Sequence, residues 1–136
     1  MEVIGLIGRL VFVAMFLESG INHIRNREQL TAYARSSGGP APELTVPLTG
    51  AMIFVGGGLI ALGVWADLGA LLLAAFLLPV SIYMHAFWKL DDPQMKTMQR
   101  THFMKNISLF GVSLLLFYVF NQCGGHLGLM AGGPLF

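Results

Sequence analysis

Charged residues are scarce in this sequence. Asp, Glu, Lys and Arg make up 11% of the 136 residues, whereas soluble domains usually carry roughly 25%. Apolar residues make up 55%, and the mean hydropathy is +0.70. So few charges do not cover the surface of a small soluble fold, and a net charge of +1 gives no basic field for nucleic acid. The sequence therefore argues against an ordinary soluble enzyme, a disordered chain and a nucleic-acid-binding protein. It favours an integral membrane protein.

Cysteine is almost absent, and this restricts redox and metal chemistry. Cys123 is the only cysteine, which excludes an intramolecular disulfide, a CxxC mechanism and zinc sites built on two or more cysteines. The histidines form no HxxxH or HExxH pair, and no acidic cluster accompanies them. We therefore expect no bound metal. The histidines are His23, His85, His102 and His126.

Long apolar runs, in contrast, are abundant. A helix needs about 20 mostly apolar residues to cross a bilayer, and four runs of this kind occur. Because backbone groups in lipid must form hydrogen bonds within their own segment, these runs should be helices. The sequence predicts an all-α fold, a four-transmembrane-helix bundle, with one domain over residues 1–136. The predicted spans are residues 3–21, 46–65, 68–87 and 103–120.

Lysine and arginine are distributed unevenly between the two ends of these spans. Seven of the eight lie in or beside the connections 22–45 and 88–102, and only Arg9 lies at the opposite end. The positive-inside rule places such connections in the cytoplasm. We therefore expect a multi-pass protein of a bacterial-type cytoplasmic (inner) membrane with both termini outside.

Several polar residues lie at one level of the predicted bundle, near its basic connections. Polar groups in a bilayer are costly, and ionisable ones are candidates for function. We predict that this layer binds the head group of a quinone or a similar ring, with histidine and lysine donating to its oxygens. Glu18 should face the bundle and pair with Asn22, His85 or Lys105, and His85 should line a cavity. The predicted ligand-binding residues are Glu18, Asn22, His23, Thr49, His85, Trp88, His102, Lys105 and Asn106.

A structural interpretation of the same residues stays open. Lys89, His102 and Lys105 lie where long or amphipathic side chains reach the lipid head groups, and Trp88 fits an aromatic belt. His85 and Glu18 could form a buried structural pair. On this interpretation the layer holds the protein in the membrane or docks a neighbour.

The order of several short motifs resembles the DoxX family over nearly the whole chain. In two places the sequence departs from the family's usual pattern: His23 stands where a lysine is common, and Met52-Ile53-Phe54 replaces a stretch that often carries an acid. The motifs are Gly8-Arg9, Phe16, Gly20-Ile21-Asn22-His23, Pro47-Leu48-Thr49-Gly50, Gly56-Gly57, Gly63, Met84-His85-Ala86-Phe87-Trp88, His102-Phe103-Met104-Lys105-Asn106 and Gly111.

The resemblance implies a four-helix inner-membrane protein linked to quinone redox chemistry. Members include a small subunit of a terminal quinol oxidase, a subunit of a thiosulfate:quinone oxidoreductase and quinone-resistance proteins. We expect a quinone as ligand, lipid contact, and other membrane subunits or further copies of the chain as partners. Two alternatives stay open: a structural or assembly subunit without ligand chemistry, and a stand-alone enzyme acting on a lipophilic substrate.

The topology can be tested with reporter fusions. Because the Lys and Arg bias places the connections 22–45 and 88–102 in the cytoplasm, a C-terminal alkaline phosphatase fusion should be active and a C-terminal fluorescent-protein fusion dark. The reverse pattern would contradict the orientation.

Overall fold

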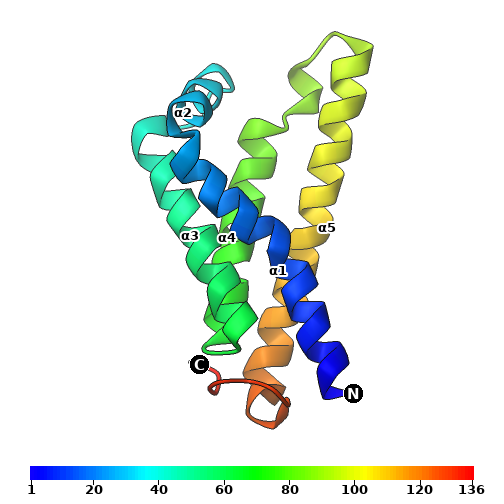
Figure 1. Ribbon diagram of the computed structural model, residues 1–136. Coiled ribbons are helices and arrows are strands. Elements are labelled where there is room, and N and C mark those ends of the chain that lie inside the picture. The colour runs from blue at the N-terminus through cyan, green and yellow to red at the C-terminus, as the bar shows by residue number, and fades with distance from the viewer.

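A computed structural model describes all 136 residues, and its secondary structure is entirely helical (Figure 1). Four helices are long and apolar enough to cross a membrane, so the predicted all-α four-helix bundle is confirmed. The protein is a multi-pass membrane protein whose helices contact lipid. The elements are α1 (Glu2–Arg25), α2 (Arg27–Ser36), α3 (Pro42–Leu62), α4 (Ala66–Met84), the short 3-10 turn η1 (Phe87–Lys89), α5 (Pro93–Cys123) and a second turn η2 (Gly124–His126).

The long helices pack in the order α1, α3, α4, α5. Close contacts join α1 to α3, α3 to α4 and α4 to α5, whereas α1 and α5 are not closely packed against each other. Both chain termini lie at one end of the bundle, and α2 and the α4–α5 connection lie at the other (Figure 1). We call these the tail end and the basic end.

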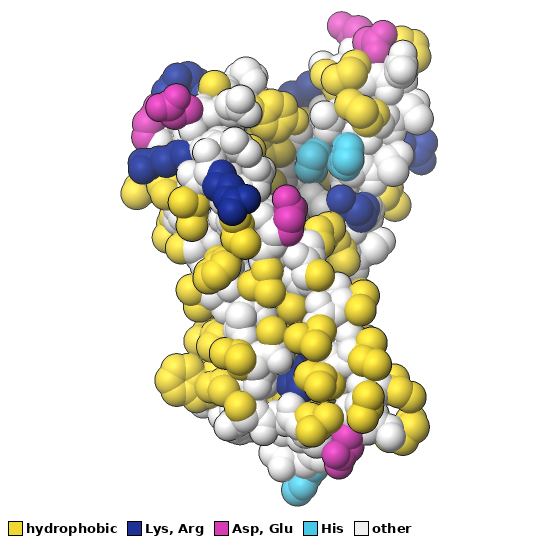
Figure 2. Space-filling model, in the orientation of Figure 1, with side chains coloured by type: hydrophobic (Ala, Val, Ile, Leu, Met, Phe, Trp, Pro, Cys, Tyr) yellow, Lys and Arg dark blue, Asp and Glu magenta, His cyan; other side chains and the backbone are white.

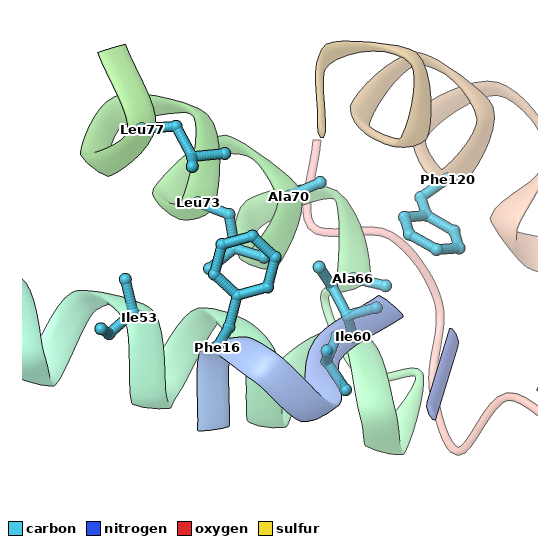
Figure 3. Close-up of a cluster of buried hydrophobic side chains, with 9 residues drawn as sticks. Phe16, Ile53, Ile60, Ala66, Ala70, Leu73, Leu77 and Phe120 are labelled. Carbon is cyan, nitrogen blue, oxygen red and sulfur yellow. The ribbon is translucent and has the colours of Figure 1, made fainter. Parts of the chain in front are cut away.

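The centre of the bundle is a cluster of buried apolar side chains contributed by all four long helices (Figure 3). α3 and α4 approach each other closely where Gly56 faces Gly69. A Cβ atom on Gly69 would lie 2.6 Å from the Gly56 carbonyl oxygen, so only glycine fits there. Small residues of this kind let membrane helices pack backbone to backbone. The buried cluster is Val13, Phe16, Ile53, Ile60, Ala66, Ala70, Leu73, Leu77 and Phe120.

Helix ends at the basic end differ from those expected from hydropathy. α5 begins at Pro93, well before the apolar run 103–120, because the Asp92 carboxylate accepts the Met95 N–H at 2.7 Å and proline suits a first helical position. α4 ends at Met84, and His85 leaves the helical conformation with φ −119°. The predicted span 68–87 therefore extends beyond the end of α4, and His85 lies in the connection that follows this helix.

α2 is a separate helix and does not continue α1. The chain turns at Asn26, with φ −115° and ψ 33°. One stripe of α2, formed by Leu30, Tyr33 and Ala34, lies at i, i+3 and i+4 and faces the bundle interior. This spacing is typical of a helix that covers an apolar surface.

The tail end is closed by the last ten residues, which fold back over it. The buried Asp67 carboxylate accepts the N–H groups of Leu135 at 3.0 Å and Phe136 at 2.9 Å. On the other side, the buried Arg9 guanidinium donates to the Leu129 carbonyl oxygen at 2.6 Å and contacts the sulfur of Met130. Two charged side chains from α1 and α4 thus hold the tail through its backbone.

Removing the Asp67 carboxylate should loosen this closure. In Asp67→Ala two backbone N–H groups lose their acceptor, which costs about 2 kcal/mol and should lower the melting temperature in detergent by about 5 °C. Asp91→Ala is the control, because Asp91 is exposed and forms no side-chain hydrogen bond. Equal melting temperatures for the two variants would contradict this role.

Candidate functional site

A cavity of about 550 Å³ lies at the basic end and is lined by residues from all five α-helices and from the α4–α5 connection. Its walls are mainly apolar, and a limited number of polar groups interrupt them. Cavities of this size and character are typical of small-molecule sites. The space-filling view shows the molecule notched at this end, with charged and histidine side chains near the notch and hydrophobic side chains below (Figure 2). The apolar wall includes Phe16, Met52, Phe76, Leu77, Val80 and Met84.

The cavity opens laterally between α1 and α5. Met15, Glu18 and Lys105 line it and are also exposed, and α1 and α5 do not close against each other. A lipophilic molecule in the bilayer can therefore reach the cavity without crossing the core.

Six of the nine predicted site residues line this one cavity. They come from four separate parts of the chain, which supports the expectation of a polar layer at one level. The six are Glu18, His23, Thr49, His85, Lys105 and Asn106.

The other three lie outside the cavity lining. The Asn22 side chain accepts a hydrogen bond from Asn26 on the surface. Trp88 is exposed and packs edge-on against Phe103, with ring centroids 5.6 Å apart. His102 stacks on His85 at 5.3 Å and therefore stands behind the lining.

Glu18 lies at the cavity, but its predicted pairing is wrong. Its side chain is exposed and forms no ion pair or hydrogen bond within the protein. The reason is the arrangement of the helices: Glu18 is on α1 and Lys105 is on α5, and these helices stand on opposite sides of the lateral opening.

His23 is held by its own helix and by α3 and α4. Its Nδ1 lies 2.8 Å from the Ser19 carbonyl oxygen, and its ring meets Phe76 edge-on at 6.4 Å. A Cβ atom on Gly50 would lie 2.6 Å from the His23 Cβ. The absence of a side chain at Gly50 is what lets this histidine sit against α3.

His85 lies at the opposite wall, where α4 has ended. Its Nδ1 is 2.7 Å from Oε1 of Gln99 on α5, and the His102 ring stacks on it. Because both partners are on α5, that helix sets the orientation of a ring carried by the α4–α5 connection.

Asn106 is a buried polar residue of the lining. Only 9% of it is exposed, it lines the cavity, and its amide has no hydrogen-bond partner in the protein. Its amide atoms are not among the buried side-chain atoms that lack a partner, so they are open to the cavity and available to a molecule in it.

Sequence reasoning missed Tyr33 and Gln99. Tyr33 lines the cavity from α2 and donates to the Met84 carbonyl oxygen at 3.1 Å. The stripe of Leu30, Tyr33 and Ala34 was a usable signal for it. Gln99 had a weaker signal, since it stands at i−3 from His102 in a segment expected to be a loop.

The fit of His23 against Gly50 predicts opposite effects for two glycines of α3. Gly50→Ala should displace the His23 ring and lower the melting temperature, because the new Cβ has no room. Gly58→Ala should leave it unchanged or raise it, since no heavy atom lies within 4 Å of that position and alanine favours a helix by about 1 kcal/mol. Equal destabilisation of both variants would contradict this packing.

Comparison with known families gives one match. Residues 4–86 match the family model described as DoxX, a range that includes α1 to α4 and His85 but ends before α5. No curated protein and no solved structure matches the chain. Because the matched range is more than half of the 136 residues, the chain belongs to the DoxX family.

Proposed function

We propose that the cavity binds the ring of a quinone, a quinol or a similar lipophilic molecule. On this proposal the protein is a subunit or accessory of a quinone-linked redox system in a cytoplasmic (inner) membrane, with the basic end in the cytoplasm. The Lys and Arg bias supports the orientation. The family resemblance and the lateral opening toward lipid support the ligand class.

The observation that carries the proposal is Asn106, a largely buried residue whose amide is open to the cavity beside an apolar wall and has no partner in the protein. A ring oxygen would give this amide a hydrogen-bond partner, which contributes about 0.5–1.5 kcal/mol. Phe76 and Leu77 offer apolar contact to the ring itself. The lining thus fits a flat apolar molecule that carries oxygens on its edge.

Each polar residue of the lining would have a separate role toward the bound ring. A bound quinone or quinol would supply the exchange of two electrons and two protons between its carbonyl and hydroxyl forms. Asn106 would hold a ring oxygen, while Lys105 lies exposed at the lateral opening, where its long side chain can extend toward the lipid head groups. His23 and His85 are held in fixed orientations by Ser19 and Gln99, so they can position the ring edge.

Purification in a mild detergent followed by lipid extraction tests the proposal. A ring compound should co-purify with the wild-type protein and be identified by its absorption and mass spectra. Asn106→Leu should weaken its binding about tenfold, the effect of losing one hydrogen bond to a buried group. Gln94→Leu is the matched control, because Gln94 lies on the same helix, is exposed and is far from the lining.

Two results would contradict the proposal. One is equal ligand content in the Asn106→Leu and Gln94→Leu proteins. The other is a larger complex that co-purifies without any ring compound, which would favour the structural or assembly subunit.

A further inference from the structure

Two hydroxyl groups of the cavity, those of Tyr33 and Thr49, already use their hydrogens inside the protein. The Tyr33 hydroxyl donates to the Met84 carbonyl oxygen at 3.1 Å. The Thr49 hydroxyl donates to the Thr45 carbonyl oxygen at 2.7 Å. A hydroxyl has one hydrogen and two acceptor lone pairs, so toward the cavity these residues can only accept.

His23 also presents an acceptor. The Ser19 carbonyl oxygen, 2.8 Å from Nδ1, can only accept, so Nδ1 carries the hydrogen. In a neutral imidazole the other nitrogen, Nε2, then has a lone pair and no hydrogen. Nε2 has no partner in the protein, and the ring is fixed by Gly50 and Phe76.

His85 repeats this arrangement from the opposite wall. Its Nδ1 lies 2.7 Å from Gln99 Oε1, and an amide oxygen accepts. The neutral ring again leaves Nε2 as an unpaired acceptor. Two histidines from separate parts of the chain thus have the same tautomer, and both line the same cavity.

The remaining polar groups increase this surplus of acceptors. The Glu18 carboxylate can only accept. Pro79 has no N–H, so the Ala75 carbonyl oxygen in the lining lacks its usual helical donor. Against these stand Lys105, which can only donate, and three groups that can donate as well as accept: the amide of Asn106 and the hydroxyls of Ser19 and Tyr83. The lining groups that can only accept outnumber the one that can only donate.

We infer that the cavity selects the hydroxyl form of its ring over the carbonyl form, so that an aromatic diol or phenol binds more tightly than the corresponding dione. Ring hydroxyls donate to Nε2 of His23 and His85, whereas carbonyl oxygens would face these lone pairs without a hydrogen between them. The inference rests on the proposed function, since it specifies which form of the ring the same cavity holds.

The tautomers can be observed without any ligand. In protein labelled with ¹⁵N-histidine and kept in detergent at about pH 8, where histidine is ordinarily neutral, both residues should give the signals of the Nδ1–H tautomer. His23→Gln and His85→Gln assign the signals. An Nε2–H tautomer at either residue would overturn the inference, whatever the ligand.

Ligand preference is measured with one ring in its two forms. The probe is a fully substituted alkyl hydroquinone and its quinone, titrated under anaerobic conditions; full substitution prevents addition to the exposed Cys123 thiol. The hydroquinone should bind about tenfold more tightly. Gln99→Leu should reduce this ratio because Nδ1 of His85 loses its acceptor, whereas Gln94→Leu, on the same helix but away from the lining, should preserve it.

The outcomes separate the two proposals. Equal affinity, tighter binding of the quinone, or a ratio unchanged in Gln99→Leu would overturn the selectivity and leave the proposed function intact. Failure of both forms to bind the wild-type protein would overturn the proposed function itself, and the selectivity with it.

Discussion

The cavity depends on how the four long helices are paired. α3 and α4 form a close central pair because Gly56 and Gly69 have no side chains where they meet. α1 packs on α3 and α5 packs on α4, so the two outer helices are held by different partners and not by each other. Space therefore remains between them, and α2 lines its basic end. The small residues that hold the centre together also leave the side of the bundle open to lipid.

The two ends of the bundle differ in whether their polar side chains are hydrogen-bonded within the protein. At the tail end the buried charges of Arg9 and Asp67 bind the backbone of the last residues, so the chain satisfies its own polar groups there. At the basic end Asn106, Glu18 and the Nε2 atoms of two histidines have no partner in the protein. Unpaired polar groups are costly in a membrane, which is why the chemistry is assigned to the basic end.

The sequence predicted the four spans and the level of the polar layer, because both follow from hydropathy and helix rise. It did not predict which residues meet across helices. His85 lines the cavity although it is not on the helix predicted for residues 68–87, since the chain leaves the helix at that residue. Three further residues lie near the expected polar layer, but their side chains do not line the cavity: Asn22, Trp88 and His102. Rotation about a helix axis and the exact end of a helix depend on packing and caps, and hydropathy contains neither.

The residue at position 23 decides whether this wall of the cavity presents hydrogen-bond donors or an acceptor. The resemblance to the family leads us to expect a lysine at this place, and its ammonium would offer three donors and no acceptor. Here the imidazole has its Nδ1–H engaged by the Ser19 carbonyl and offers a lone pair instead. Relative to that expectation, this wall of the cavity presents an acceptor in place of donors. A neutral histidine also avoids placing a second cation beside Lys105 in a lining whose only acid is Glu18. A site of this composition is suited to hold an uncharged ring by the hydrogens of its hydroxyl groups.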